Sequence, residues 1–267
     1  MERVPLPRSI KTLSADGAHA AFAIEPLYPG YGITVGNALR RVLLSSLPGA
    51  AITNVSFAGA SHEFSTLPYV KEDVVDIILN LKRIRLKLHG DGPATIRVKV
   101  NGAKTVTAGD IEASAEVEVI SKDQVIATLT DKAAAFELEM TVEAGRGYVP
   151  VEQRETPKNA LGTIAIDAVF TPIRTVNFTT ENVRVGQMTN YDRLNLDVTT
   201  DGSISPQDAV QQAATILRDH FQFVVESSFN DEAETIVETA SVETETPVEE
   251  VEEKPKKRAT KAKNDEE

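Results

Sequence analysis

The sequence predicts an α+β protein of two domains, in which a unit formed by both ends of the chain is interrupted by a β-rich insert. Three observations favour this arrangement: a helical run near the N-terminus, many short β-like runs in the middle, and a long helical run near the C-terminus. We expect the outer unit to comprise residues 1–48 and 172–230, and the insert residues 49–171. Residues 231–267 form a charged tail that we expect to be disordered.

Composition excludes several classes of protein. The 41% hydrophobic content suffices for real cores, and the absence of cysteine excludes disulfides, thiolate metal sites and a cysteine nucleophile. No apolar run approaches the roughly 18–20 residues that cross a bilayer, so we expect a cytoplasmic protein without membrane contact. The net charge is −12, and the mildly acidic first 230 residues lack the basic surface of a protein that holds nucleic acid by itself.

The first helix follows a predicted strand at 18–25 and a loop at 26–32. Glycines and a threonine precede its apolar repeat, and Pro48 and Gly49 end it. One stripe at helical spacing is predicted to face the core. It consists of Val35, Ala38, Leu39, Val42, Leu43 and Ser46.

The opposite side of this helix carries Asn37, Arg40, Arg41 and Leu44. A leucine beside two guanidinium groups is typical of a protein interface, where arginine is enriched. A solvated face with one exposed leucine fits the same residues equally well.

The middle of the chain is predicted to be β-rich. Short runs of β-forming residues are separated by turn signals at 90–93 and 101–102. The predicted strands are Ile52–Phe57, Arg85–His89, Thr95–Val100, Val117–Ile120, Val125–Leu129 and Phe136–Val142, followed by Thr163–Val169, Thr175–Phe178, Asn182–Val185 and Asn190–Val198.

A second amphipathic helix near residues 70–82 has two apolar sides. Its main stripe holds Val70, Val74, Ile77, Ile78 and Leu81, and its polar residues are Glu72, Asp73, Asp76 and Asn80. A narrower strip of Val75, Leu79 and Lys82 remains for a partner protein. The alternative is a helix buried on both sides within its own chain.

The last helix opens with Ser205 as N-cap, Pro206 at the first helical position and Asp208 in the first turn. A long seam near the 3.5-residue period follows, with alanines where a partner helix can approach closely. Packing on the chain's own sheet is the alternative. The seam comprises Val210, Ala213, Ala214, Leu217, Phe221, Val224 and Ser228.

We find no catalytic, cofactor-binding or metal-binding motif. His19, His62, His89 and His220 lie far apart, and none has a ligand spacing such as i,i+4 with a carboxylate. The segment 145–147, Gly-Arg-Gly, lacks the pattern and the strand-to-helix context of a phosphate-binding loop. A function in protein assembly is therefore favoured over catalysis.

Five segments resemble one known family. Residues 30–49, GYGITVGNALRRVLLSSLPG, closely resemble the assembly helix of the α subunits of bacterial RNA polymerase. Segments 62–66 (HEFST), 72–82 (EDVVDIILNLK), 145–150 (GRGYVP) and 213–217 (AATIL) agree with the same family and follow in its order. The resemblance covers about residues 1–230.

The resemblance implies a non-catalytic scaffold that homodimerises and gathers the β and β′ subunits for DNA-templated transcription. It implies no cofactor in this subunit, since the catalytic subunits hold the Mg²⁺, and it adds omega and sigma as partners in the holoenzyme. The dimer interface would use Val210, Ala213, Ala214, Leu217, Phe221 and Val224. The β and β′ subunits would dock on Asn37, Arg40, Arg41, Leu44, Val75, Leu79, Lys82, Arg146 and Tyr148.

The tail departs from the family pattern. Residues 231–253 hold ten acidic and no basic side chains, and 254–263 hold six basic ones. The family continues into a C-terminal domain that contacts promoter DNA, and we expect that domain to be absent and specific DNA binding to be slight. Two other functions remain open: a stand-alone β-rich ligand-binding module, monomeric with a closed pocket, and an enzyme of unknown type.

Overall fold

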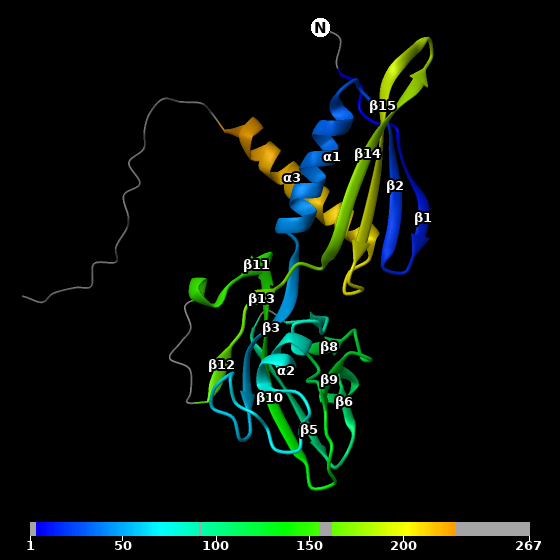
Figure 1. Cartoon of the computed structure of the whole chain (residues 1–267). Coiled ribbons are helices and arrows are strands. Elements are labelled where there is room, and N and C mark those ends of the chain that lie inside the picture. The colour runs from blue at the N-terminus through cyan, green and yellow to red at the C-terminus, as the bar shows by residue number, and fades with distance from the viewer. Residues whose placement is uncertain (1–3, 91, 155–161, 228–267) are drawn as a thin grey trace, which may run out of the picture. The chain divides into compact units, whose positions relative to one another are not determined.

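The computed structural model describes residues 4–90, 92–154 and 162–227 (Figure 1). The described chain is mostly β-sheet with three α-helices, so the predicted combination of helices and a β-rich part is confirmed. The tail at 231–267, predicted to be disordered, and Ser228 of the predicted seam lie outside the described residues. The helices are α1 (Tyr31–Ser45), α2 (Val74–Leu81) and α3 (Pro206–Glu226).

The first sheet joins segments from both ends of the chain. Its four strands are antiparallel in the order β1-β2-β15-β14. His19 pairs with Thr199, although about 180 residues separate them. The strands are β1 (Ser9–Asp16), β2 (His19–Leu27), β14 (Ile173–Val185) and β15 (Met188–Thr200).

The helices α1 and α3 complete the first core. Leu39 and Leu43 of α1 are buried against residues such as Leu194 of β15, which confirms the predicted core stripe. Each fully buried side chain of this size contributes about 1.5–3 kcal/mol of transfer free energy. Figure 1 shows α3 crossing α1, and the two helices are in contact. Both helices therefore lie on one face of the sheet, against β14, β15 and β2.

The second sheet has seven strands. Its path is β7-β5-β10-β3-β4-β8, with β12 paired to β3. Buried and exposed residues alternate along β10, so this sheet buries one face. The strands are β3 (Pro48–Phe57), β4 (Leu86–Leu88), β5 (Ala94–Asn101), β7 (Ile111–Glu112), β8 (Val117–Val119), β10 (Ala135–Arg146) and β12 (Thr163–Ala165).

Two smaller strand pairs complete the described fold. They are β6 (Thr105–Thr107) with β9 (Val125–Thr128), and β11 (Tyr148–Val149) with β13 (Ala168–Val169). Single turns of 3₁₀-helix occupy Ala108–Asp110 and Val151–Gln153.

The buried apolar residues form two separate clusters. One draws on residues 20–47 and 173–217, and the other on residues 52–166. The second cluster includes the inner side of α2, where Val74, Ile77 and Leu81 are almost fully buried. The chain thus builds one core from its two outer segments and another from the segment between them.

The structure differs from the sequence-based expectations at several elements. Strand β1 was not expected, because a bulge between Thr12 and Ser14 breaks its alternation. Strand β14 is continuous where two strands were expected, since the polar residues 179–181 also pair with β15. Val70 lies outside α2 and forms a bridge with Leu129. The expected strand 163–169 is divided between β12 and β13.

In the described part of the chain, no helix combines the length and the apolar character that crossing a membrane requires.

Candidate functional site

Helix α1 is held close to the first sheet by two glycines inside it. A Cβ at Gly36 would lie 2.6 Å from Cδ2 of Phe178 and 2.9 Å from Cδ1 of Leu194. A Cβ at Gly32 would lie 2.8 Å from Cγ2 of Thr180. Any larger residue would push the helix away from β14 and β15. The expectation that Gly32 belongs to the loop before the helix was wrong, because α1 already begins at Tyr31.

The N-terminus of α1 is capped from another element. Gly30 occupies the N-cap position with φ 85° and has no side chain to offer. Instead, Oδ2 of Asp192 on β15 accepts hydrogen bonds from the backbone N–H groups of Gly30 and Gly32, at 2.9 and 3.0 Å. A carboxylate at this end also complements the helix dipole. The sheet therefore fixes both the distance and the direction of α1.

The outer face of α1 is exposed along its whole length. Asn37, Arg40, Arg41 and Leu44 are all exposed, and Leu44 retains 38% of its accessible surface. Within the described residues, neither arginine has an ion-pair partner. Ile33, which the sequence analysis did not single out, is 58% exposed and extends the same face by one turn. This apolar and cationic stripe is available to another protein.

Helix α2 uses two of its three sides within its own chain. Its inner stripe is buried, and its polar side bonds to β9. The Asn80 amide of α2 donates a hydrogen bond to the Ile126 carbonyl at 3.1 Å. Glu72 was expected on the helix but lies just before it, where its carboxylate accepts a hydrogen bond from the Thr128 N–H at 2.7 Å. The strip of Val75, Leu79 and Lys82 is what remains, and Leu79 is half exposed.

An open hollow adjoins this strip. Its lining includes Val75, Leu79 and Lys82 together with Phe64 and Asp167. Phe64 is 80% exposed, which is unusual for an aromatic side chain without a partner. Phe64 belongs to the segment 62–66 that resembles the family, but no role was predicted for this residue. An aromatic residue close in sequence to a helix with a second apolar strip could have indicated that Phe64 belongs to the same surface.

Two predicted docking residues meet at one carboxylate. The Lys82 ammonium donates a hydrogen bond to Oδ2 of Asp167 at 3.1 Å, and Oδ1 accepts one from the Val151 N–H at 3.2 Å. The Lys82 contact, followed by the Val151 bond, lowers the pKa of Asp167 below its ordinary value. Partial desolvation raises the pKa of Tyr148 above its ordinary value, and the nearby Asp167 charge raises it further. Lys82 and Tyr148 thus belong to one surface.

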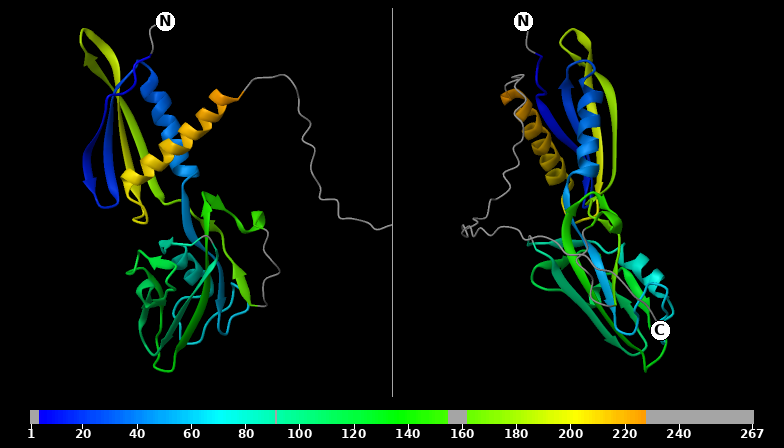
Figure 2. Two further views of the ribbon diagram at one scale, coloured as in Figure 1. Left: turned by 180° about the vertical axis from the view of Figure 1, so that it is seen from behind. Right: turned by 90° about the vertical axis from the view of Figure 1, so that its left-hand side faces the viewer.

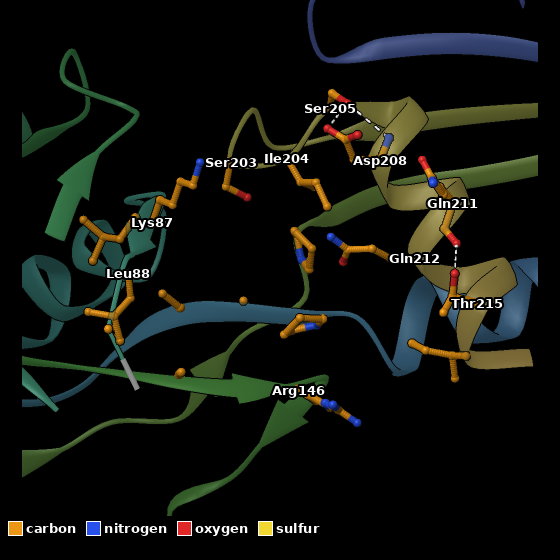
Figure 3. A pocket seen from close by; sticks show the side chains of 18 residues that line it. Lys87, Leu88, Arg146, Ser203, Ile204, Ser205, Asp208, Gln211, Gln212 and Thr215 are labelled. Atoms are coloured by element: carbon orange, nitrogen blue, oxygen red, sulfur yellow. Dashed lines mark hydrogen bonds between the residues drawn. The ribbon is translucent and has the colours of Figure 1, made fainter. Parts of the chain in front are cut away.

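Arg146 lies apart from Tyr148, although only one residue separates them. It lines an open groove with Lys87 and Gln212 (Figure 3). The residues on either side of Arg146 are glycines for structural reasons. A Cβ at Gly145 would lie 2.7 Å from the Phe170 ring, and Gly147 has φ 64°, which a larger residue rarely adopts. Both glycines of the segment 145–147 are therefore required by the course of the backbone.

Helix α3 begins as predicted, with the Ser205 hydroxyl accepting a hydrogen bond from the Asp208 N–H (Figure 3). The expectation for Ala213 was wrong. Ala213 is fully buried in the chain's own core together with Ala209, so it has no surface to offer a partner. The two alanines lie four residues apart, and their small side chains allow the helix to approach the sheet.

The rest of the predicted seam lies at or near the surface. Val210 and Leu217 are half-buried, whereas Ala214 is exposed. All residues from Arg218 to Glu226 are exposed. Four of them are large and apolar, and two of these were not predicted. Phe221 is 63% exposed, Phe223 72%, Val224 52% and Val225 83%.

Among the described residues, no group of three or more histidine or acidic side chains is arranged to hold a metal ion.

Comparison with known proteins gives a consistent result. Residues 55–171 match the family described as the RNA polymerase Rpb3/RpoA insert domain. The DNA-directed RNA polymerase subunit alpha of Symbiobacterium thermophilum is 51% identical over 224 residues, which are 84% of this chain and 70% of that protein. The chain belongs to the α-subunit family of DNA-directed RNA polymerases.

Two further relatives have the same printed name. The subunit alpha of Moorella thermoacetica is 53% identical over 207 residues, which are 78% of this chain and 66% of that protein. The subunit alpha of Heliobacterium modesticaldum is 49% identical over 227 residues, which are 85% of this chain and 72% of that protein. The match to the insert family covers most of the residues that form the second core.

Proposed function

We propose that this member of the α-subunit family is a non-catalytic assembly subunit of bacterial RNA polymerase. It homodimerises and gathers the β and β′ subunits, which perform nucleotidyl transfer. The observation that carries the proposal is the surplus of apolar surface on all three helices, each of which already buries another side in its own chain. The relatives, all named as polymerase α subunits, support the same role.

The dimer contact is assigned to the outer side of α3. Ala214, Leu217, Phe221 and Val224 fall within about 80° of one another around this helix, next to the stripe that buries Ala213, and all of them except the half-buried Leu217 are exposed. Small and aromatic residues at this spacing suit a helix–helix contact between two copies. The end of α3 has no support from its own core, so pairing with a second copy would stabilise it.

The docking surface for β and β′ is assigned to the outer faces of α1 and α2. It consists of Asn37, Arg40, Arg41 and Leu44 of α1, Val75, Leu79 and Lys82 near α2, and Arg146 and Tyr148 beyond them. A homodimer presents this surface twice. Two copies facing two different large subunits therefore use one residue set for two unlike contacts.

A stand-alone ligand-binding module would need a closed pocket. The groove of Figure 3 and the hollow beside α2 are both open to solvent. Small ligands are usually bound in concave sites that enclose most of their surface. The open shape supports the assembly function over this alternative.

The docking assignment is tested by substituting Arg41→Ala and Leu44→Ala together. Truncating two interface anchors costs roughly 2–4 kcal/mol of binding free energy, so capture of the β subunit should weaken at least tenfold. Thermal unfolding should hardly change, because both side chains are exposed. The measurement is the amount of β retained by the tagged full-length chain, beside its melting temperature.

A matched control uses the hairpin end of β14 and β15, where Arg184 and Met188 are also exposed. Arg184→Ala with Met188→Ala removes the same kinds of side chain from the same unit and should leave capture unchanged. If the Arg41→Ala, Leu44→Ala variant lost much of its stability but still captured β, the buried and exposed faces of α1 would be assigned in reverse.

A further inference from the structure

Strand β1 leaves apolar side chains uncovered on the helix-bearing face of the first sheet. Ile10 pairs with Ile24, which in turn pairs with Leu194. Directly paired residues of antiparallel strands share one face of a sheet, so these three side chains form one row. Ile24 and Leu194 are buried, whereas Ile10 is 66% exposed. The row of apolar side chains thus continues onto β1, but no helix of the described chain buries its last member, Ile10.

The neighbouring residues show that this exposure belongs to the whole strand. Thr12 pairs with the buried Phe22 and is itself exposed, and Leu13 in the bulge is 60% exposed. Helix α1 lies against β14 and β15, and α3 against β15 and β2. β1 is also an edge strand, and an uncovered apolar edge favours association unless another element covers it.

Helix α3 has the complementary property at its C-terminal end. It begins against the sheet and extends beyond it, as Figure 2 shows from two sides. Ala209, Ala213 and Ile216 form the stripe that packs on the chain's own core. At 100° per residue, Phe223 continues this stripe two turns after Ile216, where it is 72% exposed. The sheet-facing side of α3 therefore extends past the sheet that it covers.

We propose that residues 218–226 of α3 in one copy pack on β1 of a second copy, with Phe223 over Ile10 and Leu13. The contact occurs twice, because a two-fold dimer applies the same pairing in both directions. This inference rests on the proposed homodimer and adds β1 to an interface otherwise assigned to α3 alone.

A second copy is the occupant that the observations favour. Strand β1 has an apolar face that no helix covers, and the C-terminal end of α3 has an apolar side that no sheet covers. In a two-fold dimer, each copy supplies the helix end that the other copy's strand lacks. Both surfaces are then buried, and the assembly closes at a dimer. The helix end carries two phenylalanines and two valines within five residues, a suitable partner for an apolar strand face.

The absence of cysteine from the chain allows a direct test. Differently tagged full-length chains, one with Ile10→Cys and the other with Phe223→Cys, are mixed and treated with a short bismaleimide cross-linker. The matched control replaces Ile10→Cys with Lys11→Cys. Lys11 is the next residue on β1 but pairs with Ala23 and bonds to Glu25 at 2.7 Å, on the opposite face.

We expect the link between unlike chains to form at least five times faster from position 10 than from position 11. Equal or slower linking from position 10, in a preparation that sediments as a dimer, would overturn the inference and leave the homodimer intact. A preparation that sediments as a monomer at micromolar concentration would refute the proposed homodimer and this contact with it.

A second measurement does not depend on cross-linking. Ile10→Asp should raise the dissociation constant of the dimer at least tenfold, because it places a charge in an apolar contact. Val125→Asp, at an exposed valine of β9, should leave the constant unchanged. Far-ultraviolet circular dichroism of the separated chains should be the same for both variants. An unchanged dissociation constant for Ile10→Asp would also overturn the inference.

Discussion

Asp192 caps a helix to which it does not belong, by accepting a hydrogen bond from the Gly32 N–H at 3.0 Å. The same carboxylate oxygen accepts the Gly30 N–H, so one strand residue satisfies two of the backbone donors that the start of α1 leaves free. The position of the α1 outer face therefore depends on a residue that lies 160 positions further along the chain.

Asp192→Ala should lower the free energy of unfolding by about 1–2 kcal/mol, the usual cost of losing a helix cap. Asp192→Asn should cost less, because the amide oxygen still accepts one of the bonds. Urea denaturation of both variants measures the difference. Asp123→Ala, at an exposed aspartate, serves as control and should be neutral. Equal stability of the Asp192→Ala variant and the control would show that water replaces this cap.

Gly36→Ala should destabilise the protein, although alanine favours helix formation over glycine by about 1 kcal/mol. The added methyl would overlap the Phe178 and Leu194 side chains and force α1 outward, at a cost of about 1–3 kcal/mol. The melting temperature should therefore fall. Asn37→Ala, on the exposed side of the same helix, should leave it nearly unchanged. A stabilised Gly36→Ala variant would mean that the sheet side chains can move aside.

Adjacent alanines of α3 should respond differently to glutamate. Ala213→Glu places a charge in the chain's own core and should cost several kcal/mol of folding free energy. Ala214→Glu adds a charge at an exposed position, so the chain should still fold while the dimer weakens. Circular dichroism and sedimentation of the two variants separate these effects. A folded Ala213→Glu chain that is merely monomeric would contradict the core assignment.

The ion pair of Lys82 and Asp167 should contribute a small amount to the free energy of unfolding, and acid should remove this contribution. The pKa of Asp167 is lowered in the folded chain, so its stabilisation is fully present above the ordinary value of 3.8 and is lost as pH falls through the lower, folded value. Both side chains are about one third exposed, which limits the contribution to under about 1 kcal/mol. Asp167→Asn should therefore show a shallower loss of stability below pH 3.8, measured by urea denaturation at several pH values.

The sequence was sufficient where a stripe contrasts strongly with its surroundings. The contrast between two leucines and two arginines predicts which side of α1 is buried and which is exposed. In the structure, Leu39 and Leu43 are buried, whereas Arg40 and Arg41 are exposed. The family was also recognisable from short segments, since five of them follow in order.

Other features required knowledge of distant neighbours. The seam of α3 contains small residues on adjacent stripes, and only the position of the sheet shows that Ala213 is inside and Ala214 outside. The need for glycine at position 36 depends on Phe178, about 140 residues away. Strand β1 escaped prediction because its bulge interrupts the two-residue period on which strand prediction depends.

The two ends of the middle segment are joined side by side. A Cβ at Gly49, where this segment begins, would lie 1.8 Å from the carbonyl oxygen of Phe170, where it ends. Once the segment between them folds, the loop that separates β2 from β15 becomes far shorter in effect, and closing it costs less entropy. We therefore expect the middle of the chain to fold early and to act as a template that brings the two outer segments together.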